Sequence, residues 1–312
     1  MQIHYDLNHF EAVKPVVTIG TFDGVHLGHR EVISELKRIS SVSGGESVVF
    51  TFDPHPRIVI SPQEDSLRLL SAIDEKIKLI SEIGVDHLII YPFTEAFSKL
   101  TYNEFVTNIL VGKIHISSLV VGYDHRFGQG RKGDFGSLEL LAQKLKFKVE
   151  QLSQLFVDNK VVSSTKIRIA LESGDIEKAN CLLGYRYSLS GKVIEGKQLG
   201  RQLGFPTANI ETSDSHKLVP GDGVYAVLVE TGGKGYKGML NIGIRPTVNY
   251  NADHKSIEVH IFDFDADIYN SEITLLFVKK IREEQKFAGI VELQAQLTRD
   301  RLSALNILEK EI

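Results

Sequence analysis

The feature that most constrains the fold is a glycine-rich turn between an apolar run and an amphipathic segment. The turn spans residues 20–29 and reads Gly-Thr-Phe-Asp-Gly-Val-His-Leu-Gly-His. The apolar run 16–19 precedes it, and apolar residues recur after it at helical spacing, namely Val32, Ile33, Leu36 and Ile39. This order predicts a buried strand, a tight turn and a helix, the unit from which parallel α/β sheets are built.

The turn carries residues suited to holding phosphate. Gly20 and Gly24 permit a tight turn and close approach of a ligand to the backbone. Gly28 stands where the helix should begin, so free N–H groups and the positive end of the helix dipole favour an anion there. His26 and His29 flank that point as donors. We expect the turn to hold a triphosphate and to stabilise charge that develops on it; the alternative is two histidines in an ordinary surface turn.

Strands and helices alternate through the first half of the chain. Further strands are predicted at residues 47–52, 87–91 and 118–122, after an entry segment at residues 1–12. Helices are predicted after Ser71, after Thr101, over residues 138–145, after Ser163 and from Asp175 to Gly184. This alternation predicts a parallel, doubly wound sheet.

Polar residues follow two of these strands. Phe-Asp-Pro-His-Pro at residues 52–56 places His55 between two prolines at the carboxyl end of a strand, where open α/β sheets bind ligands. An ordinary loop explains the same pattern. Gly-Tyr-Asp at residues 122–124 could likewise bring Asp124 to the site.

A cluster of hydroxyls and cations marks a later helix start. Ser163, Ser164 and Thr165 are followed by Lys166 and Arg168 within one turn. Hydroxyl, backbone and cationic donors that converge in this way suit phosphate oxygens. A plain N-cap is the alternative, but it accounts for one hydroxyl and not for three hydroxyls followed by two cations.

Composition narrows the class of protein. At 312 residues the chain exceeds what one hydrophobic core usually serves, so we expect two domains. A net charge of −4 offers no basic face for a nucleic-acid backbone. No apolar run approaches the ~18 residues of a membrane span, and the N-terminus lacks a signal peptide's pattern, so we expect a cytoplasmic protein. The single cysteine, Cys181, lies in an apolar helical stretch and is expected to be buried.

The pattern changes near Tyr185, where we place the boundary between domains 1–184 and 185–312. Short β-rich runs separated by glycine follow, at residues 188–194, 224–230, 236–242, 256–264 and 273–279. Five or six such strands predict a small antiparallel barrel. A closing helix should place five apolar residues on one face: Ile290, Leu293, Leu297, Ala304 and Leu308.

Two groups of this second half suit phosphate chemistry. Thr207 and Asn209, in Gly-Phe-Pro-Thr-Ala-Asn, offer hard oxygen ligands of the kind that Mg²⁺ accepts beside phosphate, although a simple turn gives the same pattern. Glu258 alternates with the apolar residues of its strand. It either faces solvent or acts as a general base toward a hydroxyl.

The turn at residues 20–29, Phe-Asp-Pro-His-Pro and Ser-Ser-Thr-Lys-Ile-Arg together resemble the adenylyltransferase half of the bacterial bifunctional riboflavin kinase/FAD synthetases. The resemblance implies that the phosphate of FMN attacks the α-phosphorus of ATP and that pyrophosphate leaves. It implies catalytic roles for His26 and His29 at the ATP phosphates. The implied ATP- or phosphate-binding residues are Gly20, Phe22, Asp23, Gly24, Gly28, Ser163, Ser164, Thr165 and Arg168, and the implied flavin-side residues are His55, Asp124 and Phe127. The family usually has Phe where this chain has His125.

Four motifs of the second half resemble the riboflavin kinase module of the same family. They cover residues 200–209, 241–247, 258–260 and 281–287. The resemblance implies a six-stranded barrel that moves the γ-phosphoryl group of ATP to the ribityl 5′-hydroxyl of riboflavin. By this mapping Thr207 and Asn209 hold Mg²⁺ with ATP, and Glu258 accepts the hydroxyl proton. Arg282 and Phe287 then lie on the flavin side.

We therefore expect one enzyme with two sites, which uses ATP and Mg²⁺ to convert riboflavin to FMN and FMN to FAD. One alternative is a riboflavin kinase whose first domain is inactive or uses another acceptor. Another is a flavin-binding regulator or carrier without turnover. The expected partners are these small molecules, without nucleic acid or membrane, and no motif specifies an oligomeric state.

Overall fold

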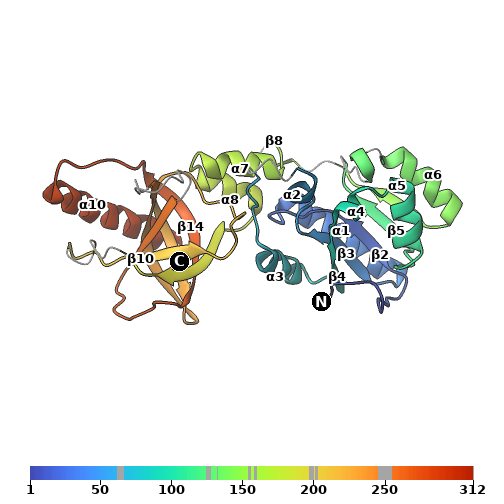
Figure 1. The fold of residues 1–312 in the computed structure, drawn as a ribbon, viewed down its shortest axis with the longest axis horizontal. Coiled ribbons are helices and arrows are strands. Elements are labelled where there is room, and N and C mark those ends of the chain that lie inside the picture. The colour runs from blue at the N-terminus through green and yellow to red at the C-terminus, as the bar shows by residue number, and fades with distance from the viewer. Residues whose placement is uncertain are drawn as a thin grey trace. The chain divides into compact units, whose positions relative to one another are not determined.

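The computed structural model describes residues 1–61, 67–123, 128–131, 133–153, 156–157, 160–196, 200, 203–244 and 255–311. The chain forms two compact units, Met1–Ser164 and Thr165–Ile312 (Figure 1). The boundary between the compact units lies earlier in the chain than residue 184, because helix α8 (Ile176–Leu183) belongs to the second unit. This helix packs on the last barrel strand, and its Asn180 side chain donates to the Phe277 carbonyl at 2.9 Å. The division at 184/185 stays a prediction about functional modules.

The first unit is built on a six-stranded parallel sheet with the order β1-β4-β3-β2-β5-β6. Three strands were predicted nearly to the residue: β2 (Val16–Ile19), β3 (Ser47–Asp53) and β4 (His87–Pro92). A fourth, β5 (Ser118–Val121), was also predicted. The edge strands were not predicted: β1 (Gln2–His4) lies within the expected entry segment, and β6 (Lys148–Gln151) follows the helix at 138–145.

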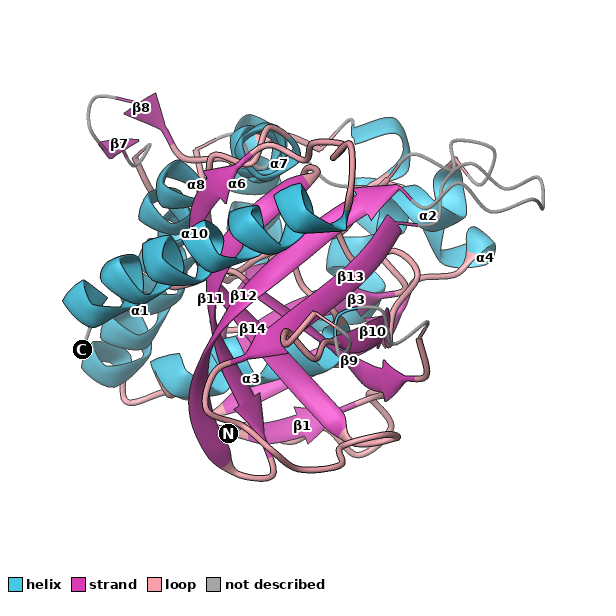
Figure 2. Ribbon diagram, turned by 90° about the vertical axis from the view of Figure 1, so that its left-hand side faces the viewer, coloured by secondary structure: helices cyan, strands magenta, loops and turns pink. Residues whose placement is uncertain are grey.

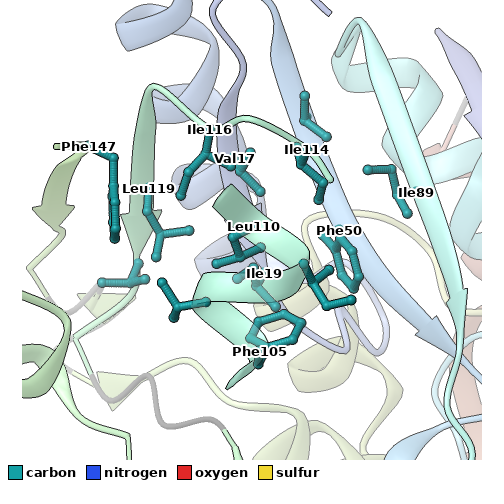
Figure 3. Packing of buried hydrophobic residues seen from close by; sticks show 14 of the residues in the cluster. Val17, Ile19, Phe50, Ile89, Phe105, Leu110, Ile114, Ile116, Leu119 and Phe147 are labelled. Carbon is teal, nitrogen blue, oxygen red and sulfur yellow. The ribbon is translucent and has the colours of Figure 1, made fainter. Parts of the chain in front are cut away.

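Helices cover both faces of this sheet, which is why its strands read as continuous apolar runs. Alternate strand residues point to opposite faces. Val17, Ile19 and Phe50 pack under the π-helical turn η1 (Phe105–Val111) and helix α6 (Phe135–Leu145), as Figure 3 shows for Phe105 and Leu110. Their neighbours in sequence, Val16 and Val49, pack under α1 (Leu27–Ser43) and α3 (Ile73–Ile83) on the other face.

The strand order places the ligand crevice. After β2 the chain adds β3 and β4 on one side, and then returns to place β5 on the other side of β2. In open α/β sheets such a reversal opens a crevice at the carboxyl ends of the strands. The glycine-rich turn at residues 20–29 leaves β2 at this reversal, so topology alone puts it at the preferred binding edge.

The remaining elements of the first unit are short. Near the binding edge lie α2 (Pro56–Ile60), α4 (Glu95–Ser98) and α5 (Tyr102–Glu104), with η2 (Gln129–Arg131), β7 (Phe156–Val157) and β8 (Lys160–Val161) later in the chain. Helix α6 starts at Phe135 rather than at 138, because the Asp134 carboxylate accepts the Ser137 N–H at 2.9 Å and caps it earlier.

The second unit contains a closed six-stranded antiparallel barrel with the order β10-β13-β12-β11-β14-β9 (Figure 2). Five strands correspond to the predicted ones: β9 (Ser188–Ile194), β11 (Gly223–Thr231), β12 (Lys234–Ile244), β13 (Lys255–Ile261) and β14 (Glu272–Arg282). The sixth, β10 (Ala208–Thr212), lies where the sequence indicated only a turn. It begins two residues after Pro206 and pairs with β9 and β13 to close the barrel.

Helices flank this barrel in the second unit. Helix α7 (Ser164–Glu172) precedes α8, and α10 (Ile290–Leu308) lies along the barrel before the short turn η3 (Glu309–Glu311) (Figure 2). The predicted apolar face of α10 is correct toward its end, where Ala304 and Leu308 join the cluster of Met239 and Phe262. It is wrong for Ile290, which is 62% exposed because the helix contacts the barrel only from its middle onward.

Cys181 is exposed, contrary to the prediction. Helix α8 turns Ala179, Leu182 and Leu183 inward, and a residue between those positions falls on the opposite face. Within the described part of the chain, no helix is both long enough and apolar enough to cross a membrane.

The close pairing of β9 with β10 gives a test of the barrel. A Cβ at Gly191 would overlap the carbonyl oxygen of Glu211 and lie 2.9 Å from Ile210 Cγ2. We predict that Gly191→Ala lowers the free energy of unfolding of the barrel unit by about 1–3 kcal/mol, the usual cost of overpacking. Gly235→Ala is the control, because a Cβ there meets no atom within 4 Å. Unfolding of the two variants by denaturant and by heat in a calorimeter measures this difference. Equal stability of Gly191→Ala and Gly235→Ala would contradict the described pairing of β9 with β10.

Candidate active sites

The Asp23 carboxylate organises the turn after β2. It is 3% exposed, and its Oδ1 accepts the backbone N–H groups of Leu70 at 2.9 Å and Ser71 at 3.2 Å. The Ser71 hydroxyl in turn accepts the Gly24 N–H at 3.0 Å. The turn is thereby tied to the segment that leads into α3. Asp23 was expected to bind ATP or phosphate, and at least one of its oxygens is used by the fold.

The backbone of the turn is strained where a ligand would approach it. Gly24 takes a φ of 79°, and Phe22 and Val25 take positive φ angles of 45° and 35°, which side chains rarely adopt. Strain of this kind gathers at functional sites, where the surrounding structure imposes it. Gly20 also serves packing, because a Cβ there would lie 3.1 Å from the Phe22 ring.

The two histidines lie face to face at the start of α1. Their ring centroids are 3.6 Å apart with planes inclined by 15°, and His26 Nδ1 caps the helix by accepting the His29 N–H at 3.3 Å. Gly28 makes the stack possible, since a Cβ there would lie 3.3 Å from the His26 ring. Within the described contacts, the N–H groups of Leu27 and Gly28 donate to no protein acceptor. This is the arrangement expected of a helix start that receives an anion.

His29 is a neutral histidine in this environment. The residue keeps some exposed surface, but its Nδ1 is buried and has no hydrogen-bond partner among the described residues. Burial, and then the nearby His26 and Lys76, hold the pKa of His29 well below its usual 6.5. An unpaired buried ring nitrogen costs free energy unless a ligand completes its bonding. His29 therefore suits a hydrogen-bonding role toward a bound group more than a role as a fixed cation.

The hydroxyl cluster that follows begins helix α7. The Ser164 hydroxyl donates to the Asp23 carbonyl at 3.1 Å, which joins this helix start to the turn, and Ser163 lies just before it, partly buried. Thr165 is exposed and Arg168 partly exposed on the first two turns of α7. Ser164 is the first residue of the helix, and its hydroxyl bonds to the glycine-rich turn and not to an N–H group of its own helix.

His55 also lies at the binding edge, directly after β3. It is 8% exposed and caps α2, its Nδ1 accepting the Arg57 N–H at 3.2 Å. Asp124, Phe127 and the variant position His125 lie outside the described residues. Lys76 on α3 carries no motif signal and was missed from the sequence, although it is buried and acts electrostatically on His29.

The barrel presents a polar row across three neighbouring strands. Glu258 on β13 pairs with Asn209 on β10 and with Asn241 on β12, and directly paired residues share a face of the sheet. The Thr207 hydroxyl lies 3.5 Å from Glu258 Oε2. A Cβ at Gly196 would overlap the Asn209 amide. The predicted residues Thr207, Asn209 and Glu258 thus come together. Asn241, which begins the motif at residues 241–247, joins them through the strand pairing.

Glu258 lies on the outer face of the barrel. The neighbours Ile257 and Val259 point into the core, 5% and 1% exposed. His260, on the face of Glu258, is covered by Phe205 and by Pro206, whose carbonyl lies 2.7 Å from His260 Nδ1. Burial lowers the pKa of His260, so this ring is neutral and supports the segment that carries Thr207.

Arg282 and Phe287, the two residues predicted on the flavin side of the barrel, lie close together. The guanidinium of Arg282 stands 5.7 Å from the centre of the Phe287 ring. The Asp300 carboxylate, 1% exposed on α10, accepts from Arg282 Nε at 3.0 Å and from Nη2 at 2.7 Å. Such a two-point pair fixes the plane of the guanidinium, and Nη1 also donates to the Glu283 carbonyl at 2.9 Å.

Comparison with known proteins assigns a family to each part of the chain. Residues 10–166 match the family model of FAD synthetase, and residues 183–308 match that of riboflavin kinase. A bifunctional riboflavin kinase/FMN adenylyltransferase from Bacillus subtilis is 38% identical over 298 residues, covering 95% of this chain and 93% of that protein. Its counterpart from Escherichia coli is 38% identical over 291 residues, covering 93% and 91%.

A solved structure has the same fold over nearly the whole chain. It is a crystal structure of a macrolide-efflux protein from Streptococcus pneumoniae, 29% identical, with a TM-score of 0.88. The match covers 97% of this chain and 98% of that one.

The neutral state of His29 gives a pH prediction. Its pKa lies below 6.5 in the folded chain and returns toward 6.5 on unfolding. Between the two values the unfolded chain binds more protons, so the free energy of unfolding of the first unit falls as the pH drops below 6.5 and does not change from this cause above it. His29→Phe keeps the ring and should remove this component. Ring resonances of His29 that titrate at or above 6.5 in an NMR titration would contradict the assignment.

Proposed function

The chain belongs to the bifunctional riboflavin kinase/FMN adenylyltransferase family, and from this premise we propose how its residues divide the two reactions. The barrel phosphorylates riboflavin to FMN, and the α/β unit transfers the adenylyl group of ATP to FMN, giving FAD and pyrophosphate. The observation that carries the proposal is that each matched half has its own constellation: stacked histidines at a strand reversal, and a carboxylate in a polar row on a barrel.

In the α/β unit we propose an in-line displacement at phosphorus. A phosphate oxygen of FMN forms a bond to the α-phosphorus of ATP, and the bond from that phosphorus to the bridging oxygen breaks as pyrophosphate leaves. The start of α1 and the ring nitrogens of His26 and His29 donate to phosphate oxygens whose charge grows in the transition state. Ser163, Thr165 and Arg168 hold the leaving phosphates. No proton needs to leave the attacking phosphate, so positioning and charge stabilisation suffice.

In the barrel the nucleophile is a hydroxyl, which must lose a proton. The ribityl 5′-oxygen of riboflavin forms a bond to the γ-phosphorus of ATP, ADP leaves, and the Glu258 carboxylate accepts the proton. Its place beside Thr207 and Asn209 brings the base next to the residues proposed to hold ATP. A general base so placed contributes roughly 10²–10⁴ in rate.

The oxygen donors of the barrel suit Mg²⁺ brought in with ATP. Mg²⁺ prefers one or two protein oxygens together with phosphates and water. The Thr207 hydroxyl and the Asn209 amide are hard oxygen donors beside the Glu258 carboxylate, so the residues fit the ion. When bound, the ion supplies positive charge to the phosphates of ATP. The protein's share is to hold the nucleotide and keep the hydroxyl within reach of Glu258.

The flavin-side assignments belong to the same proposal. Arg282 and Phe287 bind riboflavin in the barrel, while His55, Asp124 and Phe127 contact FMN in the first unit. We also keep as proposals the functional boundary at 184/185, the cytoplasmic location and the absence of nucleic-acid partners. The supporting observation for the barrel is the orientation of Arg282 by Asp300 next to Phe287.

A time course tests both activities together. Purified protein is incubated with riboflavin and Mg²⁺-ATP, and the flavins are separated by chromatography. We expect FMN to rise first and FAD to follow. FMN that accumulates without FAD would instead support a kinase whose first unit is inactive or uses another acceptor. Flavin binding without ATP consumption would indicate a carrier.

Removing the ring nitrogens of His29 should affect one reaction only. We predict that His29→Ala lowers the rate of FAD formation from FMN by ~10²–10³, the usual loss when one transition-state donor is removed. His29→Phe should give a similar loss while keeping the ring stack. Riboflavin phosphorylation in the same samples is the control and should remain normal. Unchanged FAD formation in both variants would remove His29 from the site.

Glu258 should show the opposite selectivity. We predict that Glu258→Gln lowers riboflavin phosphorylation by ~10²–10⁴ and leaves the conversion of supplied FMN to FAD intact. The matched control is Glu230→Gln, an exposed glutamate on β11 of the same barrel. Phosphorylation at the wild-type rate in Glu258→Gln would show that another group takes the proton.

A further inference from the structure

Lys76 occupies a core position of helix α3. Its neighbours on the same helical face are Ile73, Ile77 and Ile80, which pack with Phe22 and Val25 of the glycine-rich turn and with the sheet. Lys76 is only 5% exposed. Lysine is among the residues least often fully buried without a partner, so its place in this apolar stripe requires a specific reason.

The described residues give the Lys76 side chain no direct partner, and its Nζ is not among their fully buried polar atoms that lack one. In the part of the chain that the structure describes, the Lys76 side chain makes no hydrogen bond and no ion pair. A buried lysine normally binds a carboxylate or several carbonyls, because an uncompensated charge in the interior is costly. Among the described residues, the burial of this side chain is therefore not offset by a hydrogen bond or an ion pair of its own.

Among the described residues, the carboxylates that act on Lys76 stand at the carboxyl ends of two neighbouring strands, the edge at which the candidate adenylyl site lies. They are Asp23 at the end of β2 and Asp53 at the end of β3, and Lys76 in turn acts on His29 at the start of α1. Helix α3 is tied to this place, because Asp23 and Gly24 bond to the segment 70–71 that leads into it. The Glu75 carboxylate closes the helix start by accepting the Ala72 N–H at 2.9 Å.

We propose that Lys76 is a phosphate-binding residue of this site, where its ammonium group binds a phosphate oxygen of a substrate. The inference rests on the proposed adenylyl transfer, and goes beyond it by adding a cation that no motif of the sequence marks. Two substrates carry the required chemistry, the polyphosphate of ATP and the phosphate of FMN. A cation whose side chain is largely buried next to a neutral histidine acts on phosphate more strongly than a fully solvated surface lysine would.

The charges of Asp23 and Asp53 are consistent with a phosphate-binding role for Lys76. Burial lowers the pKa of Lys76, while the charges of Asp23 and Asp53 act in the opposite direction. Oδ1 of Asp23 is already used by two backbone N–H groups. A bound phosphate would supply the missing counter-charge.

The alternative is that Lys76 is merely a structural lysine of α3. The two roles differ in what Lys76→Met does to stability. Methionine has nearly the same length and suits an apolar stripe, so replacing an uncompensated charge should leave the unfolding temperature unchanged or raise it. A lysine that holds the helix in place would instead lower that temperature when replaced.

The experiment compares Lys76→Met with Lys78→Met in the full-length protein. Lys78 is exposed on the same helix and controls for net charge. FAD formation is measured from supplied FMN, which bypasses the barrel, with ATP and FMN varied in turn. The reverse reaction, from FAD and inorganic pyrophosphate, is measured with pyrophosphate varied. Riboflavin phosphorylation and the unfolding temperature are recorded in the same preparations.

We expect Lys76→Met to lose roughly 10- to 100-fold in kcat/KM for the substrate whose phosphate it binds, as for a lost charge-assisted hydrogen bond. A loss for ATP and pyrophosphate assigns the contact to the polyphosphate, and a loss for FMN alone assigns it to FMN. Lys78→Met should match the wild type, and both variants should phosphorylate riboflavin normally.

Wild-type kcat/KM for ATP, FMN and pyrophosphate in Lys76→Met would overturn the inference and leave the proposed function standing. A lowered unfolding temperature with a parallel loss of both activities would also overturn it, in favour of the structural role. A wild-type protein that forms no FAD at all would overturn the proposed adenylyl transfer itself, and with it this inference.

Discussion

The first unit depends on one buried carboxylate. Asp23 holds the backbone of residues 70–71, and its carbonyl accepts the Ser164 hydroxyl, so three segments far apart in sequence meet at the end of β2. Hydrogen bonds from backbone N–H groups to a buried carboxylate are among the stronger ones, at about 1.5–3 kcal/mol each. The positive φ angles of Phe22 and Val25 can persist because this network over-determines the turn. The histidine stack, the start of α1 and Lys76 all take their places from it.

In the barrel, the functional side chains are positioned by strand register and not by a turn. Closing the sheet leaves no free edge, so functional groups must lie on a face. Direct pairing of Asn209, Glu258 and Asn241 fixes a polar row whose spacing does not depend on loops. A slip of one residue in β13 would turn Glu258 into the core and His260 with it, so the apolar residues Ile257 and Val259 specify the active face as well as the fold.

The sequence predicts those elements whose conformation depends on a few consecutive residues. Apolar runs buried on both faces, helix caps such as Asp175 and the glycine stops are properties of a few consecutive residues, and they were predicted within a residue or two. Strand β10 was missed because Pro206 and Thr207 look like a turn, and only pairing with β9 and β13 makes the following residues a strand. Lys76 and Asp300 were missed for one reason: each matters through a partner or a site distant in sequence, and neither stands in a motif. Asn241 opens the motif at residues 241–247, but it was given no role because only strand pairing places it beside Glu258. The prediction that Cys181 is buried was wrong because the sequence of a short apolar helix does not reveal which of its faces packs on the barrel.

The two sites must balance the charge of ATP by different means. At the first site the groups placed next to the turn are mostly neutral donors, namely the start of α1 and the rings of His26 and His29, and two of the nearby charges are the carboxylates of Asp23 and Asp53. Neutral donors stabilise the developing charge in the transition state but do little to offset the charge that ATP brings. Among the described residues no group of three or more His, Cys, Asp or Glu side chains could hold a metal ion alone. The contact proposed for Lys76 would therefore add positive charge at the place where the other donors of this unit are neutral, and the burial of the lysine next to Asp23 and Asp53 is the arrangement that would make this charge available to a phosphate.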